Sequence, residues 1–202
     1  GTFDWVYEEE LGLRDGFRWS PDGKSIAYWQ LDEEGVKEMT MLNHVPGNYP
    51  QIIQFRYPKV GETNSHCRIG VVPATGGETK WVQVEGDSRE HYLARMEWAD
   101  NSTQLLIQRL NRLQNHNNVL LAEAATGKSR TVYTDKDDAW IEVRFGFTDW
   151  VDDWFTYVSE REGWRQLYLI SRDGDSQKIT GGKYDIVRML KVDTANNCAY
   201  FI

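Results

Sequence analysis

Three consecutive glutamates, Glu8, Glu9 and Glu10, form the most unusual chemical feature near the start of the chain. Adjacent carboxylates repel one another unless solvent or a cation screens their charge. One interpretation is the first turn of a helix, where acidic side chains complement the helix dipole and remain in water. The other is a cation site, because a primary ammonium has three hydrogen-bond donors and two converging carboxylates would satisfy it. Residue type alone leaves both interpretations open.

The other residue types with catalytic potential lack a productive spacing. No Gly-x-Ser-x-Gly nucleophile motif is present, because the segments around Ser25 and Ser88 both lack the second glycine. Adjacent residues such as His66 and Cys67 would point to opposite faces of a strand, which is poor geometry for one metal ion. The four histidines are scattered without metal-ligand spacing: His44, His66, His91 and His116. We therefore predict no catalytic group, no metal site and no cofactor in these 202 residues.

The charge of the chain makes some kinds of binding partner unfavourable. The formal net charge is −8 and no run of Lys or Arg exceeds two residues, which argues against a nucleic-acid partner. An acidic surface would tolerate a cationic ligand, although acidity that only maintains solubility is the simpler explanation. The two cysteines, Cys67 and Cys198, could form one disulfide or remain two free thiols.

The candidate residues belong to a chain of short apolar strands separated by turns. Residues 17–28 (FRWSPDGKSIAY) contain two such strands joined by a Pro-Asp-Gly turn, in which proline sets φ and glycine supplies a positive φ. The first unit then continues into a strand near 37–43. Further units open near residues 96–101, 145–147 and 187–192. Their later strands are expected at 104–110, 118–123, 129–133, 154–159, 166–171 and 177–180.

The spacing of these units predicts the fold class. Trp98 follows Trp19 by about 80 residues, and the next two anchors, Phe147 and Val192, follow at about 50 and 45, close to the length of a four-stranded propeller blade. The first interval equals a blade plus an insertion at 46–61. A β-sandwich has a similar strand count, but the recurring order of aromatic strand, turn and apolar strand favours a propeller.

We therefore predict an all-β fold, a partial propeller that forms an open arc of three to four four-stranded blades. Strands at 67–72 and 81–84 would complete the first blade after the insertion. A short helical turn near residues 7–11 would carry the glutamates.

Several motifs, in order along the chain, resemble those of the dipeptidyl peptidase IV family. Residues 4–10 (DWVYEEE) resemble its double-glutamate motif, and residues 19–23 (WSPDG) follow at a similar spacing. Residues 57–61 (YPKVG) are similar to the family's Tyr-Pro-Lys-Ala-Gly insertion, and residues 159–168 (SEREGWRQLY) to its Ser-Glu-x-x-Gly-Tyr-Arg blade motif. Two shorter blocks also match, at 91–93 and 112–115. Together the blocks cover almost the whole chain.

The resemblance implies an eight-bladed propeller above an α/β-hydrolase domain, with peptides cleaved between them. In that family two adjacent glutamates on a short helical insertion bind the free amine of the substrate. By position in the motif these are Glu9 and Glu10, while Tyr7 and Glu8 orient the segment. The implied activity is that of a serine-type dipeptidyl peptidase that releases X-Pro or X-Ala dipeptides. The implied partners are peptides with a free N-terminus and the hydrolase domain, with homodimerisation as one option and a periplasmic or cell-surface location.

The chain departs from the family pattern in what it lacks. The resemblance places the catalytic Ser, Asp and His in the hydrolase domain, and a substrate-binding propeller arginine upstream of Gly1. Residues 140–145 (WIEVRF) lie where some relatives have substrate-pocket Phe and Arg residues, but the alignment shifts there and assigns no role. We therefore expect residues 1–202 to be a piece of one propeller domain, without peptidase activity of its own.

Two other functions fit the same repeats. A non-enzymatic propeller that binds proteins through its faces would have this composition. The propeller of another prolyl oligopeptidase-superfamily peptidase, such as an acylaminoacyl peptidase, would also fit. Because those enzymes do not need a free amine, the glutamate pair argues against the second alternative.

Overall fold

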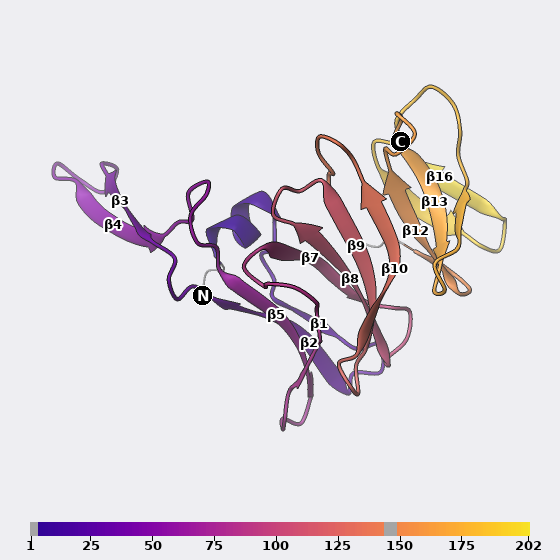
Figure 1. Cartoon of the computed structure of the whole chain (residues 1–202), viewed down its shortest axis with the longest axis horizontal. Coiled ribbons are helices and arrows are strands. Elements are labelled where there is room, and N and C mark those ends of the chain that lie inside the picture. Colours follow the sequence, from indigo (N-terminus) through magenta and orange to yellow (C-terminus); the bar gives the residue numbers. More distant parts are fainter. Residues whose placement is uncertain (1–3, 144–148) are drawn as a thin grey trace.

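The computed structural model describes residues 4–143 and 149–202 of the chain. The described part is all-β except for one π-helical turn, η1 (Val6–Glu10). Three four-stranded antiparallel sheets and a two-stranded sheet follow one another as the blades of an open arc, and a separate two-stranded ribbon projects from the first blade (Figure 1). The predicted partial propeller is confirmed. No helix in residues 4–143 or 149–202 has the length and apolar character needed to cross a membrane.

The first blade forms around the predicted Pro-Asp-Gly turn. Its strands, in spatial order, are β1 (Phe17–Trp19), β2 (Ser25–Asp32), β5 (His66–Pro73) and β6 (Lys80–Trp81). In the turn, Gly23 has a φ of 69° and its N–H donates to the Ser20 carbonyl at 2.9 Å. Proline and glycine therefore set the turn that reverses the chain between β1 and β2.

The prediction that residues 37–43 continue the first blade was wrong. This segment is β3 (Glu38–Asn43), which pairs with β4 (Gln51–Arg56) in a ribbon that belongs to no blade. We call this ribbon, residues 38–56, the arm. A strand exposed on both faces can carry the same short apolar pattern as a blade strand, so the pattern did not distinguish them. The insertion therefore starts before residue 38 rather than at residue 46.

The later blades agree with the expected strands. The second blade has the order β10-β9-β8-β7, and the third has the order β11-β12-β13-β14. Residues 145–147, expected to open the third unit, lie outside the described residues. The predicted fourth unit is the pair β15–β16. The strands are β7 (His91–Trp98), β8 (Gln104–Asn111), β9 (His116–Glu123), β10 (Ser129–Lys136), β11 (Trp150–Val151), β12 (Trp154–Ser159), β13 (Gln166–Ser171), β14 (Ser176–Lys178), β15 (Met189–Asp193) and β16 (Cys198–Phe201).

The hydrophobic core lies between the faces of neighbouring blades. One cluster joins the first and second blades and includes the buried side chains of Trp29, Ile69 and Leu93. A second cluster joins the second and third blades and includes Leu106 and Phe155. Burying apolar faces against the next sheet is what makes each blade depend on its neighbours. Of the two cysteines, Cys67 is buried and Cys198 is exposed, and both are free thiols.

A glycine turn also joins the first two blades. Gly127, in the β9–β10 hairpin, has a φ of 72°, and its carbonyl accepts a hydrogen bond from the Gln83 N–H at 2.8 Å. A Cβ atom at this position would lie 2.0 Å from the carbonyl oxygen of Trp81. The position therefore requires glycine both for its backbone conformation and for its close approach to the neighbouring blade.

Candidate functional site

The turn that carries the three glutamates is built on a buried aspartate. Asp4 is 2% exposed, and its Oδ1 atom accepts a hydrogen bond from the Tyr7 N–H at 3.0 Å. Its Oδ2 atom accepts a second from the Ser65 hydroxyl at 2.6 Å, just before β5. The Leu11 N–H donates to the Val6 carbonyl at 3.0 Å and closes the π-helical turn. A carboxylate that would be costly to bury alone is therefore satisfied while it fixes the start of η1.

Tyr7 fixes the same turn to the second blade. Its side chain is 1% exposed, and its hydroxyl oxygen accepts a hydrogen bond from the Leu93 N–H at 3.0 Å. Its ring packs edge-on against Tyr92, with 6.0 Å between the ring centroids. Burial raises the pKa of Tyr7 well above its ordinary value, and the adjacent Cys67 thiol adds to this effect. Tyr7 therefore stays neutral and positions the turn from inside the fold.

The three glutamates differ in their surroundings. Glu8 is half-buried and does not line the pocket described below. Glu9 and Glu10 are exposed, and both line this pocket. Glu9 also forms an ion pair with Arg14, with 3.8 Å between the charged atoms. The turn thus presents two consecutive carboxylates at the pocket, while the buried residues Asp4 and Tyr7 hold its other side.

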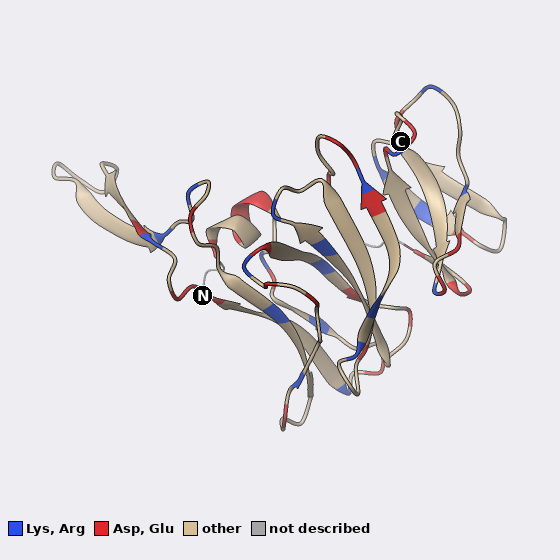
Figure 2. Cartoon of the chain, viewed as in Figure 1, with Lys and Arg blue, Asp and Glu red and all other residues tan. Residues whose placement is uncertain are grey.

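The pocket has a volume of about 900 Å³ and is lined by several elements of the fold. Strands β7, β8, β10, β12 and β15 contribute to its lining together with η1 and the segment 140–143. Figure 2 shows acidic residues on η1 and at the end of β10 on the same side of the arc. The lining carries six carboxylates, namely Glu9, Glu10, Asp135, Asp137, Glu142 and Glu160. It also carries five basic side chains, namely Arg95, Lys136, Arg161, Arg165 and Arg188.

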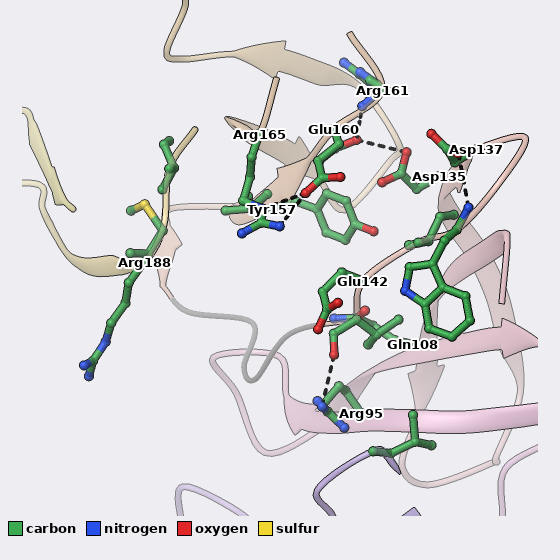
Figure 3. A pocket seen from close by; sticks show the side chains of 18 of the residues that line it. Arg95, Gln108, Asp135, Asp137, Glu142, Tyr157, Glu160, Arg161, Arg165 and Arg188 are labelled. Carbon is green, nitrogen blue, oxygen red and sulfur yellow. Dashed lines mark hydrogen bonds and ion pairs between the residues drawn. The ribbon is translucent and has the colours of Figure 1, made fainter. Parts of the chain in front are cut away.

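A buried acid lines the same pocket as the glutamates. Asp135 is 5% exposed and accepts a hydrogen bond from the Ser159 hydroxyl at 3.0 Å. Burial raises the pKa of Asp135, although hydrogen bonds from Ser159 and Tyr157 oppose this shift. Burial also raises the pKa of Tyr157 well above its ordinary value. These groups form a polar wall between the second and third blades (Figure 3).

Two arginines of the pocket are held in different ways. The Nε atom of Arg165 donates to Glu160 at 2.9 Å, so its charge is paired within the lining. Arg95 is 9% exposed and donates to the Val143 carbonyl at 3.0 Å. Burial lowers the pKa of Arg95 to about 10, and the charge of Arg18 adds to this effect. Arg95 therefore remains a cation at neutral pH, on the opposite side of the pocket from Arg165 and Glu160 (Figure 3).

The sequence indicated only part of this lining. Glu9 and Glu10 were singled out, and of the segment 140–145 the residues 140–143 line the pocket, whereas 144 and 145 lie outside the described residues. Arg95, Asp135 and Tyr157 were not predicted, because strands from separate blades bring them together. The one local signal was a polar residue at a strand position that alternation assigns to the buried face.

The family model for the dipeptidyl peptidase IV (DPP IV) N-terminal region matches residues 1–202. A probable dipeptidyl peptidase 4 from Emericella nidulans is 27% identical over the whole chain. An inactive dipeptidyl peptidase 10 from Rattus norvegicus is 28% identical, also over the whole chain. The chain covers 29% and 27% of these two relatives, respectively.

Solved structures share the fold of the chain. The crystal structure of Porphyromonas gingivalis dipeptidyl peptidase 4 matches the whole chain at a TM-score of 0.87 and 28% identity, over 29% of its own length. A putative dipeptidyl aminopeptidase IV from Bacteroides ovatus shares the fold, with a TM-score of 0.80 at 23% identity over 92% of this chain and 29% of its own. Fold, motifs and relatives agree, and the chain belongs to the dipeptidyl peptidase IV N-terminal region family.

Proposed function

We propose that this chain is the substrate-binding part of the propeller of a serine-type dipeptidyl peptidase, and that Glu9 and Glu10 bind the free amino terminus of the peptide. Tyr7 and Glu8 orient the turn. The observation that carries the proposal is that two consecutive carboxylates line one pocket on a turn fixed from inside the fold. The pocket volume of about 900 Å³ is within the range of small-ligand sites.

The chemistry of an ammonium group explains why two carboxylates are used. The group donates three hydrogen bonds, and each bond to a carboxylate stabilises the complex by roughly 1.5–3 kcal/mol. Because Glu9 and Glu10 are exposed, solvent screening favours the lower end of that range. Fixing the amine in this way sets how many residues separate it from the bond that is cut. Anchoring the amine at a fixed distance favours release of dipeptides, and the resemblance to the dipeptidyl peptidase IV family implies X-Pro or X-Ala as their sequence.

In this proposal the nucleophile and its acid–base partners come from a hydrolase domain that faces the pocket. The chain spans less than a third of the length of the relatives it matches, so it would supply recognition rather than bond cleavage. Peptides with a free N-terminus are the proposed ligands. The net charge of −8 disfavours nucleic acid as a partner.

The experiment uses the full-length protein and two substrates, Gly-Pro-p-nitroanilide and its N-acetylated form. Acetylation removes the ammonium and leaves the scissile bond unchanged. We expect Glu9→Gln and Glu10→Gln each to lower kcat/KM for the free-amine substrate by roughly tenfold or more. Turnover of the acetylated substrate should change little. Equal losses for both substrates, or no loss, would refute the proposed role.

A matched control is Glu78→Gln, because Glu78 is an exposed acid that does not line the pocket. It removes the same charge from the protein, so any effect of general electrostatics would appear in it as well. We expect its kcat/KM for both substrates to equal that of the wild type.

A non-enzymatic propeller that binds proteins is the second candidate, because one relative that matches the whole chain is named as inactive. Measuring the binding of Gly-Pro beside turnover separates the two functions. A full-length protein that binds Gly-Pro through Glu9 and Glu10 but has no turnover would support the second candidate.

A further inference from the structure

Three aromatic side chains join the glutamate turn to the arm. The Trp5 ring stacks on Phe55 with 5.1 Å between centroids and an interplanar angle of 24°. It also meets the Tyr57 ring edge-on at 5.4 Å, and Phe55 and Tyr57 are nearly perpendicular at 6.2 Å. All three distances lie in the range of favourable aromatic pairs. We call these residues the aromatic cluster.

The cluster connects two motifs that are about 50 residues apart in the sequence. Trp5 belongs to the segment DWVYEEE and Tyr57 to the segment YPKVG, and the proposed amine-binding role uses neither residue. Phe55 lies near the end of β4, where the arm returns to the blade. The arm therefore meets η1 at its base, while the rest of the ribbon projects away from the fold (Figure 1).

The base of the arm is well fixed, whereas its far end is exposed. The Arg56 guanidinium donates to the Val36 carbonyl at 2.7 Å and to the Glu33 carbonyl at 3.1 Å. At the far end, Val45 is 91% exposed and Tyr49 is 87% exposed. The aromatic cluster therefore lies at the fixed base of the arm, between the arm and the η1 turn.

Trp5 contacts the arm from a side of the η1 turn that Asp4 and Tyr7 do not hold. The inner side is fixed by the hydrogen bonds of Asp4 and Tyr7. Trp5 is the N-cap residue of η1, and its side chain makes no capping hydrogen bond. Glu9 and Glu10 follow it by four and five residues, which is about one turn of a π-helix. Contact at Trp5 thus restrains the turn on the side opposite to its buried anchor.

We propose that the aromatic cluster is a positioning element that sets the place of Glu9 and Glu10 through the base of the arm. Trp5, Phe55 and Tyr57 would not touch the substrate. The proposal rests on the proposed amine-binding role of the two glutamates. Loss of the cluster would let the turn move, so the two carboxylates would converge less often on one ammonium.

The test uses calorimetric titration of the full-length protein with the dipeptide Gly-Pro and with N-acetyl-Gly-Pro. We expect Phe55→Ala to weaken Gly-Pro binding roughly two- to tenfold, the scale of one aromatic pair, and to leave N-acetyl-Gly-Pro binding unchanged. Phe55→Tyr should restore wild-type affinity. Phe55→Leu, which keeps much of the apolar volume in case the alanine variant fails to fold, should be intermediate.

Two comparisons separate this proposal from its alternatives. The control variant is Ile52→Ala, which alters an exposed residue of the same strand outside the cluster and should bind both ligands like the wild type. In a protein that already carries Glu9→Gln and Glu10→Gln, Phe55→Ala should have no further effect on Gly-Pro.

The outcomes distinguish the two proposals. If the glutamate variants lose Gly-Pro binding but Phe55→Ala does not, the cluster is not a positioning element and amine recognition stands. If the glutamate variants bind like the wild type, amine recognition itself is wrong. Equal weakening of both ligands by Phe55→Ala, or the same loss in Ile52→Ala, would also overturn the positioning role.

Discussion

Replacement of Tyr7 by phenylalanine tests how the glutamate turn is held in place. The change removes only the hydroxyl oxygen that accepts the Leu93 N–H at 3.0 Å, and it keeps the ring that packs against Tyr92. Tyr7 is 1% exposed, so water cannot replace the lost acceptor. An unsatisfied buried N–H costs roughly 1–3 kcal/mol, so the free energy of local opening should fall by that amount.

Hydrogen exchange of the full-length protein, read by mass spectrometry, measures this change. A loss of roughly 1–3 kcal/mol corresponds to exchange that is about 5- to 150-fold faster in peptides covering η1 and β7. Tyr200→Phe is the matched control, because it removes a hydroxyl from a half-exposed ring on β16 and should leave these peptides unchanged. A change below twofold in the Tyr7→Phe variant would mean that this hydrogen bond does not hold the turn.

Two further predictions concern the blades. Gly127→Ala should lower the Tm by several degrees, because it combines a strained φ with a clash against Trp81, at a cost of roughly 1–3 kcal/mol. Gly23 also has a positive φ but open space around a Cβ atom, so Gly23→Ala should lower the Tm less than Gly127→Ala. Equal decreases in Tm would mean that the close approach of Gly127 to Trp81 does not contribute to stability. Burial lowers the pKa of His91 to about 4, so the imidazole binds a proton at a higher pH in the unfolded chain than in the folded one. As the pH falls from 6.5 to 4, the free energy needed to open β7 should therefore decrease by about 3 kcal/mol. In the exchange assay His91→Gln should remove most of this dependence, whereas exchange in a variant of the exposed His44 should keep it.

The turns and paired strands were predictable because their signals are local. The Pro-Asp-Gly turn before β2 and the apolar strands β12 and β13 appear at the residues that the sequence indicates. Residues 38–43 of the arm were assigned wrongly, because β3 pairs with β4 and nothing within these residues shows whether a blade lies beside them. Pairing partners depend on chain topology, which a single segment does not contain.

Only the part of the site that lies within one short segment of the sequence was predictable. Glu9 and Glu10 lie side by side in the sequence, and their motif is recognisable. The burial of Asp4 was not apparent, because its partner Ser65 is far along the chain and lies beyond the arm. The polar wall around Asp135 likewise depends on the packing of one blade on the next.

A crystal structure of the full-length protein with Gly-Pro bound would test directly whether Glu9 and Glu10 bind the amino terminus of a peptide. We expect the dipeptide nitrogen to lie about 2.7–2.9 Å from a carboxylate oxygen of Glu9 and from one of Glu10, the distance of charge-assisted hydrogen bonds. A dipeptide bound in the pocket with its amine directed away from both glutamates would contradict the account.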